Sequence, residues 1–150
     1  MFQSRRFGIS SGSLMSISSL LFVYGSLMRG GVRHRHLLGT GITPLGAASI
    51  CARLFHMADA DYPVAIPGSH PRERVHGELY TIDEPARTLA VLDRMEECKQ
   101  GLFRRKLVWI RQGPAKEARQ AWAYFYARTL NQATPVRDGR FRRRRLSSGD

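Results

Sequence analysis

Short runs of apolar and β-branched residues, separated by glycine, proline and serine, divide the chain into extended segments. Leu20 to Tyr24 is a continuous apolar run and predicts a buried strand, and residues 47–57 predict a second, interrupted strand. Two further strands are predicted over residues 102–110 and 121–127, which are rich in aromatic and branched side chains. The pattern therefore favours a protein built mainly from strands.

Between the strands predicted at residues 47–57 and 102–110, the chain contains a loop and a further strand whose two faces differ. Residues 59–73 hold three prolines and a glycine, so they cannot form regular structure throughout. In the following residues 75–82, Val75, Gly77, Leu79 and Thr81 alternate with the set His76, Glu78, Tyr80 and Ile82. Such a period of two predicts a strand with a different environment on each side.

One helix is predicted, over residues 84–97. Asp83 is the expected N-cap and Pro85 lies in the first turn, while Leu89 and Leu92 follow at helical spacing. Several short strands with a helix inserted among them indicate an α+β domain, in which a small closed or strongly curved sheet packs against the helix.

The first candidate site is the end of the strand at Tyr24, where the chain continues through Gly25, Ser26 and Leu27. A strand that stops at small residues leaves backbone N–H groups without partners, and glycine lets a ligand approach the main chain, so this end can cradle an anion. An ordinary turn is the alternative. Ser26 could also act as a nucleophile with His34 or His36 as its base, but no Gly-x-Ser-x-Gly motif surrounds it.

The second candidate site is Glu96, at the end of the predicted helix. Pro85, Leu89, Leu92 and Glu96 recur at spacings of four, three and four, so the carboxylate continues an apolar stripe. Burial and the negative end of the helix dipole should both raise its pKa, which suits a group that exchanges protons near neutrality. Glu97 points elsewhere.

Two other environments for Glu96 remain open at this point. The side chain could emerge into solvent where the helix ends, or it could form an ion pair with Arg104 or Arg105.

The charge of the chain is strongly basic and lies largely near its ends. The 150 residues are 43% hydrophobic, which fits one domain, and carry a net charge of +12. Six arginines fall within residues 137–150, which we expect to serve solubility and anion attraction more than the fold. Nucleic acid is not the expected partner, because no recognition-helix, zinc-finger or stacking-platform signature accompanies the charge.

Neither a metal nor an organic cofactor is predicted. Cys51 and Cys98 are far apart, and His34 and His36 lack companion ligands.

No apolar run approaches the roughly 20 residues of a membrane span, so we expect a soluble, cytoplasmic protein. We expect an N-terminal extension over residues 1–18, with Met15 as an alternative start, a domain over 19–145 and a tail over 146–150.

The order and spacing of several motifs resemble those of the gamma-glutamylcyclotransferase-like superfamily, in its short bacterial, gamma-glutamylamine cyclotransferase-like branch. These motifs are VYGSLMRG, DYPVAIPG, VHGELYTID, LAVLDRMEEC, LFRRKLVWI, AWAYFY and VRDGRFRRR, and they cover about residues 20–145. The resemblance implies a small mixed β-barrel flanked by helices. It also implies a reaction that needs no cofactor, in which the α-amine of a γ-glutamyl compound attacks its own γ-carbonyl to release an amine and 5-oxoproline.

The resemblance assigns roles to the two candidate sites. Glu96 matches the family's catalytic glutamate, a general acid and base, and Tyr24, Gly25, Ser26 and Leu27 match its substrate loop. Phe103 stands where relatives commonly have a tyrosine, so a hydroxyl that could bind substrate is missing. The sequence leaves open which amine departs, and whether the chain is a non-catalytic binding module on the same fold.

Overall fold

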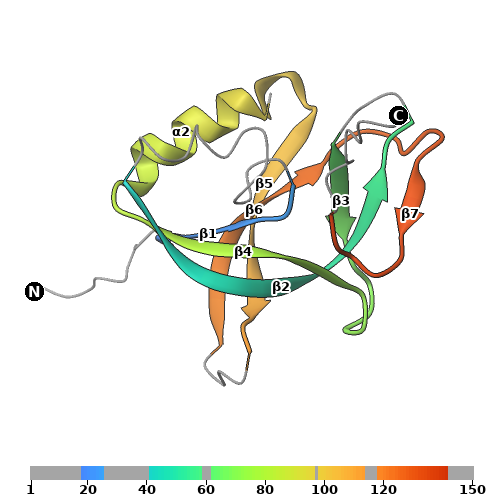
Figure 1. The fold of residues 1–150 in the computed structure, drawn as a ribbon. Coiled ribbons are helices and arrows are strands. Elements are labelled where there is room, and N and C mark those ends of the chain that lie inside the picture. The colour runs from blue at the N-terminus through green and yellow to red at the C-terminus, as the bar shows by residue number, and fades with distance from the viewer. Residues whose placement is uncertain (1–17, 26–40, 59–61, 97, 114–117, 142–150) are drawn as a thin grey trace, which may run out of the picture.

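The computed structural model describes residues 18–25, 41–58, 62–96, 98–113 and 118–141. Within these ranges one α-helix and one short 3-10 helix accompany a seven-stranded sheet (Figure 1). The elements in chain order are β1 (Leu20–Val23), β2 (Ile42–His56), β3 (Pro63–Pro67), β4 (Arg74–Ile82), α2 (Pro85–Met95), η1 (Cys98–Gln100), β5 (Phe103–Arg111), β6 (Arg119–Tyr126) and β7 (Thr134–Val136).

Five of the strands form a closed barrel. They follow the order β2-β4-β1-β6-β5, and β5 pairs again with β2 through Ser49 and Ile50. The barrel is mixed, because β1 runs parallel to β6 and antiparallel to β4. This architecture confirms the α+β barrel expected from the sequence, and it leaves no free edge between these five strands.

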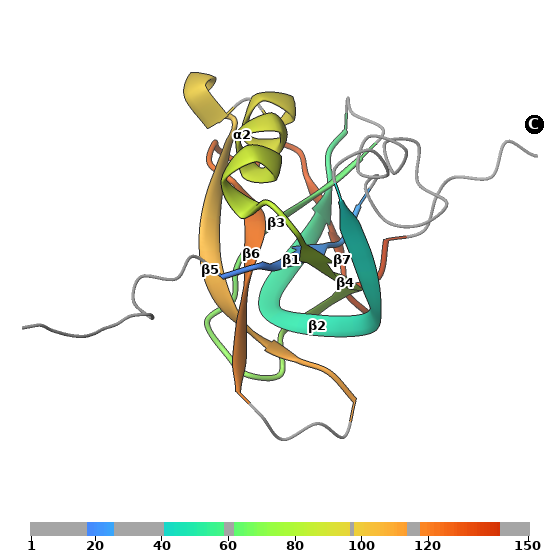
Figure 2. The ribbon, with the colours of Figure 1, turned by 90° about the vertical axis from the view of Figure 1, so that its left-hand side faces the viewer.

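Strand β2 is long enough to belong to two parts of the sheet. Its first part pairs with β4 in the barrel, whereas Leu54 to His56 pairs with β3 on one edge and β7 on the other. A bulge between Pro44 and Gly46, where Gly46 has a φ of 100°, interrupts the pairing with β4. Figure 2 shows the strong curvature of β2 around the barrel.

Alternate residues from Leu21 to Tyr24, in β1 and just after it, enter two different cores. Phe22 and Tyr24 join one cluster with residues of β2, β4 and β6, whereas Leu21 and Val23 join a second cluster that contains the buried face of α2. Leu89 and Leu92 supply that face. The helix therefore covers one side of the barrel, above β1 and β4 in Figure 1.

The structure confirms most predicted elements and corrects others. All five predicted strands are present, and β2 begins five residues before the predicted start at residue 47. Two short strands were not predicted, β3 within residues 59–73 and β7 near the C-terminus. The prediction of Asp83 as N-cap was wrong, because Glu84 occupies that position without a side-chain bond and the Asp83 N–H donates to the Gly41 carbonyl at 2.9 Å.

Residues 137–141 contribute to the fold, although we expected residues 137–150 to serve solubility and anion attraction more than the fold. The His76 N–H donates to the Gly139 carbonyl at 2.8 Å, and Arg140 pairs with His76 in a β-bridge. Phe141 packs against the cluster that contains Phe22. A backbone hydrogen bond, a β-bridge and one aromatic ring thus tie this segment to the barrel. Residues 142–150 lie outside the described ranges.

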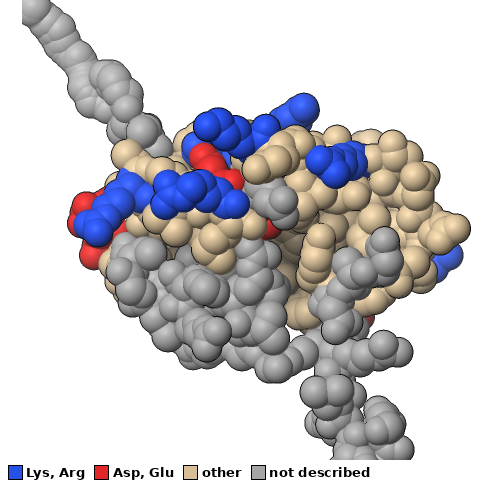
Figure 3. Space-filling view, turned by 90° about the horizontal axis from the view of Figure 1, so that it is seen from above, with Lys and Arg blue, Asp and Glu red and all other residues tan. Residues whose placement is uncertain are grey.

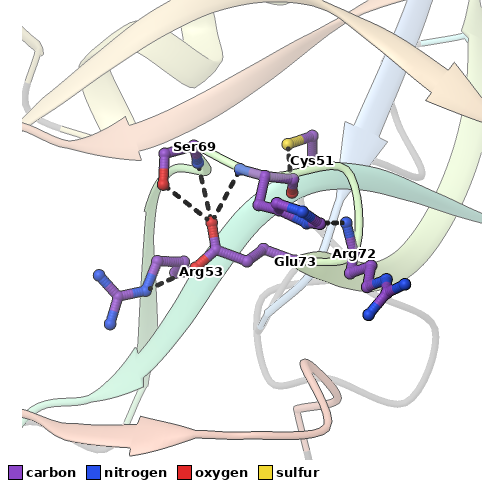
Figure 4. A network of polar contacts seen from close by, with 6 residues as sticks. Cys51, Arg53, Ser69, Arg72 and Glu73 are labelled. Carbon is purple, nitrogen blue, oxygen red and sulfur yellow. Dashed lines mark hydrogen bonds and ion pairs between the residues drawn. The ribbon is translucent and has the colours of Figure 1, made fainter.

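The turn between β3 and β4 is organised by one carboxylate (Figure 4). Glu73 Oε1 accepts from the backbone N–H groups of Ser69 at 2.8 Å and His70 at 3.2 Å, and Arg53 lies 3.4 Å from Oε2. These contacts hold the pKa of Glu73 below its ordinary value, the Ser69 hydrogen bond being the largest cause. The charged form of Glu73 therefore stabilises this turn.

The charges around the helix are of both signs. Figure 3 looks down on the α2 side and shows basic and acidic side chains next to one another around the helix. Arg87 and Glu84, for example, form an exposed pair at 3.8 Å. No helix in the described part of the chain is long and apolar enough to cross a bilayer.

Candidate functional site

Glu96 ends helix α2 and lies in the protein interior. It is the C-cap residue, its N–H donates to the Leu92 carbonyl at 2.9 Å, and the residue is only 8% exposed. Leu89 and Leu92 on the same face are buried as well. This burial confirms the predicted apolar stripe, and the alternative in which Glu96 emerges into solvent is wrong. Glu97 lies outside the described residues.

Tyr24 directly follows Val23, the last residue of β1, and its hydroxyl is bonded from two sides. Its buried hydroxyl donates to the Tyr124 carbonyl at 2.6 Å and accepts from the Ala65 N–H at 3.3 Å. Burial raises the pKa of Tyr24 far above its ordinary value, and the negative charge of Glu96 raises that pKa further. The strand end and the helix end thus interact electrostatically in the folded chain.

Gly25 follows in a confined position next to β3. A Cβ atom at this residue would lie 3.3 Å from Pro63 Cγ and 3.4 Å from Pro63 Cδ, so a larger side chain would press on that ring. Ser26 and Leu27, the other two predicted cradle residues, lie outside the described ranges. Two of the four predicted cradle residues, Tyr24 and Gly25, therefore lie in the described part of the chain.

A polar network that was not predicted lies one turn before Glu96. Asp93 receives two charge-assisted hydrogen bonds from Arg105, with Nε to Oδ1 at 2.9 Å and Nη2 to Oδ2 at 3.2 Å. The Tyr124 hydroxyl donates to the same Oδ1 at 2.6 Å. Arg105 also stacks 4.5 Å from the centroid of the Trp122 ring. Arg105 is thus the partner of Asp93 in an ion pair that joins α2 to β5 and β6.

This network is connected to the candidate site through one residue. Tyr124 bonds Asp93 with its hydroxyl and accepts the Tyr24 hydrogen bond with its carbonyl oxygen. The sequence did carry a signal for Asp93, since it lies three residues before Glu96 and four after Leu89, on the flank of the buried stripe.

The neighbouring side chains are aromatic or unreactive. Phe103 is buried and meets the Tyr126 ring edge-on at 5.6 Å and the Tyr62 ring at 6.4 Å. Burial raises the pKa of the Cys98 thiol, as do the charges of Asp93 and Glu96, so this cysteine is not poised as a thiolate nucleophile. Among the described residues, no group of three or more His, Cys, Asp or Glu side chains is placed to hold a metal ion.

Comparison with known proteins supports the resemblance noted in the sequence. The family model described as gamma-glutamyl cyclotransferase, AIG2-like, matches residues 21–143. An AIG2-like protein from Mus musculus is 25% identical, with a TM-score of 0.63 over 75% of this chain and 79% of that one. YkqA from Bacillus subtilis is also 25% identical, with a TM-score of 0.62 over 83% of this chain but only 40% of its own.

A more distant structure, named gamma-glutamyl cyclotransferase, shares the fold. It is 15% identical to this chain, with a TM-score of 0.58 over 79% of this chain and 72% of its own. No curated protein sequence matched significantly.

Proposed function

Because the chain belongs to the gamma-glutamyl cyclotransferase, AIG2-like family, we propose that it converts a γ-glutamyl group to 5-oxoproline with release of an amine or amino acid. The observation that carries this proposal is the burial of Glu96 together with the effect of its charge on Tyr24. A carboxylate beside a strand end provides both a proton carrier and a place for an anionic substrate group.

Glu96 is the proposed proton carrier. It would take a proton from the substrate α-ammonium group, and the resulting amine would attack the γ-carbonyl carbon, forming the ring C–N bond. The tetrahedral centre would then collapse, breaking the original γ-amide bond, while Glu96 returns this proton to the departing nitrogen. The freed carboxylate would then take the second proton that the ring nitrogen must lose and pass it to the released amine or to water, so that both protons lost by the α-nitrogen are accounted for. Proximity of the reacting groups is supplied by the substrate itself.

The backbone of Tyr24, Gly25, Ser26 and Leu27 is the proposed cradle. Its N–H groups would bind the substrate α-carboxylate or the oxyanion that develops on the γ-carbonyl oxygen. The confined position of Gly25 favours this role, because a side chain there would press on the Pro63 ring and displace the main chain of the cradle.

The Asp93–Arg105 pair and Phe103 would shape the proposed site. Asp93 and Arg105 would act as positioning residues, since they fix Tyr124, whose carbonyl oxygen holds the Tyr24 hydroxyl. Phe103 would present an aromatic wall without a hydroxyl, which favours binding of an apolar part of the leaving amine over a hydrogen-bonded one.

Release of 5-oxoproline from a panel of γ-glutamyl amines, γ-glutamyl amino acids and γ-glutamyl peptides tests the reaction and identifies the amine. On an active substrate, Glu96→Gln should lower kcat by about 100-fold or more, since it retains size and hydrogen-bonding shape but cannot cycle a proton. Glu97→Gln, which removes the same charge one position later, is the matched control and should change kcat little. Equal turnover by Glu96→Gln and the parent would remove Glu96 from the mechanism.

The competing function is a binding module that holds a γ-glutamyl ligand without turnover. It predicts saturable binding of a compound from the panel together with no release of 5-oxoproline, so binding calorimetry on the same compounds separates the two functions.

A further inference from the structure

A hollow opens on the surface of the barrel, near the end of β1. Its volume is about 630 Å³, and neither Glu96 nor Tyr24 lines it. The last residue of β1, Val23, pairs with Glu78, and two residues away His76 pairs instead with Arg140. The hollow therefore lies where β4 passes from β1 to the C-terminal segment. Its lining residues are Ala47, Ala48, Ser49, His76, Gly77, Glu78, Arg111, Gly113, Arg140 and Phe141.

The strand register places basic side chains on one face of this hollow. Ser49 of β2 pairs with His76 of β4 and with Arg111 of β5, and residues directly opposite in antiparallel pairs project to the same side. Arg74, two residues before His76, projects to that side as well. Strands β4 and β5 thus contribute basic side chains to one surface, beside Ser49 of β2.

Ser49, which lines the hollow, fixes the position of the Arg74 side chain. Its Nε donates to Ser49 Oγ at 3.1 Å, and its Nη2 donates to the Ser49 carbonyl oxygen and hydroxyl, each at 3.0 Å. Ser49 is buried, so these bonds hold the guanidinium rigidly. Arg74 is not among the residues that line the hollow, so it contributes a positive charge held in place behind Ser49.

Neighbouring positive charges disfavour protonation of the basic groups around the hollow. Burial lowers the pKa of Arg74, and the charge of Arg111 lowers it further. The pKa of His76 is lowered first by burial and then by Arg140 and Arg74, with Asp138 opposing them. Within the described part of the chain, no ion pair joins Arg111 or Arg140 to an acid. A bound anion would relieve this repulsion.

We propose that this hollow, lined by Arg111, Arg140 and His76 and backed by Arg74, binds a phosphate-bearing small molecule. A phosphate monoester carries about −1.5 to −2 charges at neutral pH, and its oxygens match the paired N–H donors of arginine. The volume lies in the range of about 300–1,000 Å³ that is typical of organic ligands and exceeds the needs of a lone ion. Phe141 and the alanines would contact the apolar part of the ligand.

A small molecule fits this surface better than nucleic acid does. Glu78 lines the hollow and Asp138 influences His76, so acids interrupt the basic surface. A backbone-binding groove needs a longer uninterrupted run of positive charge.

The test is calorimetric titration with three phosphates: adenosine monophosphate, glycerol 3-phosphate and inorganic pyrophosphate. Adenosine and succinate serve as ligand controls, and a single-stranded RNA oligonucleotide as a third. We expect one-to-one binding of at least one phosphate with a Kd below about 1 mM, weakened at least about tenfold by Arg111→Gln and by Arg140→Gln.

Arg104→Gln is the matched control variant, because Arg104 is an exposed arginine of the same strand, β5. It lies seven residues from Arg111, or about 23 Å along the strand, and its loss should change the Kd less than about twofold.

Four outcomes would overturn the proposal. They are no binding of any of the three phosphates, equal weakening by Arg104→Gln, binding of succinate as tight as that of the phosphates, and binding of RNA alone. Because no turnover is measured, failure here is distinguishable from failure of the proposed cyclotransferase reaction.

Discussion

Gly77→Ala tests how closely β1 must approach β4 for the candidate site to form. A Cβ atom at residue 77 would overlap the Val23 carbonyl oxygen, and it would lie 2.8 Å from Phe22 Cζ and 3.0 Å from the Val23 carbonyl carbon. Carbon atoms in contact are ordinarily about 3.5–4.0 Å apart. Since two of these atoms belong to the backbone and the overlap with the carbonyl oxygen is the most severe, β1 must move away from β4 by about 1 Å.

The cost of this movement can be worked from the contacts that it disturbs. Overpacking of a buried site costs about 1–3 kcal/mol, and weakening one or two bonds of the β1–β4 ladder adds about 1 kcal/mol. We therefore expect the free energy of unfolding to fall by about 3 kcal/mol, which corresponds to a Tm lower by roughly 10 °C for a domain of this size. Displacement of Val23 also shifts Tyr24 and Gly25, so cyclotransferase activity should fall along with stability.

Urea unfolding followed by circular dichroism measures the effect, with Gly101→Ala as the control. Gly101 has a φ of 77° and open space around its Cβ position, so its replacement costs only the backbone strain of about 1–2 kcal/mol. A loss below about 0.5 kcal/mol for Gly77→Ala, or a loss no larger than that of Gly101→Ala, would refute the reasoning.

Two further variants test single polar groups. Tyr24→Phe leaves the Ala65 N–H and the Tyr124 carbonyl without their buried partner, so the free energy of unfolding in urea should fall by about 1–3 kcal/mol; a change under about 0.5 kcal/mol would contradict this. Glu73 has a folded-state pKa below its unfolded value, so its stabilisation is present above the unfolded pKa and disappears as the pH falls through the folded pKa. The stability gap between parent and Glu73→Gln should therefore narrow as the pH falls below about 4.3, the ordinary pKa of glutamate, and a gap that does not change with pH would count against the turn network.

The elements that could be predicted from the sequence are those whose periodicity coincides with burial. The run from Leu20 to Tyr24 and the stripe that ends at Glu96 both follow this rule. Strands β3 and β7 do not, because each is short and contains proline, which indicates a loop. Both lie outside the five-stranded barrel path and pair with the last part of β2, where their prolines are tolerated.

The polar network around Asp93 shows a second limit of prediction. Periodicity places Asp93 beside the buried stripe, yet its partners Arg105 and Tyr124 come from two later strands. Their meeting depends on the pairing register of β5 with β6, in which Arg105 lies opposite Tyr124. A local pattern in the sequence does not contain that register. In the same way, no local pattern shows that Gly139 and Arg140 pair with His76. From the sequence alone, the arginines near the C-terminus therefore resemble a solvated tail.

The double pairing of β2 sets an order for folding during synthesis. Leu54 to His56 finds its first partner, β3, only a few residues later, but its second partner, β7, is made about 80 residues afterwards. Until Thr134 to Val136 leaves the ribosome, one edge of this segment is open to pairing with another nascent chain. Ribosome-bound chains that stop before β7 should therefore associate more readily than the complete protein.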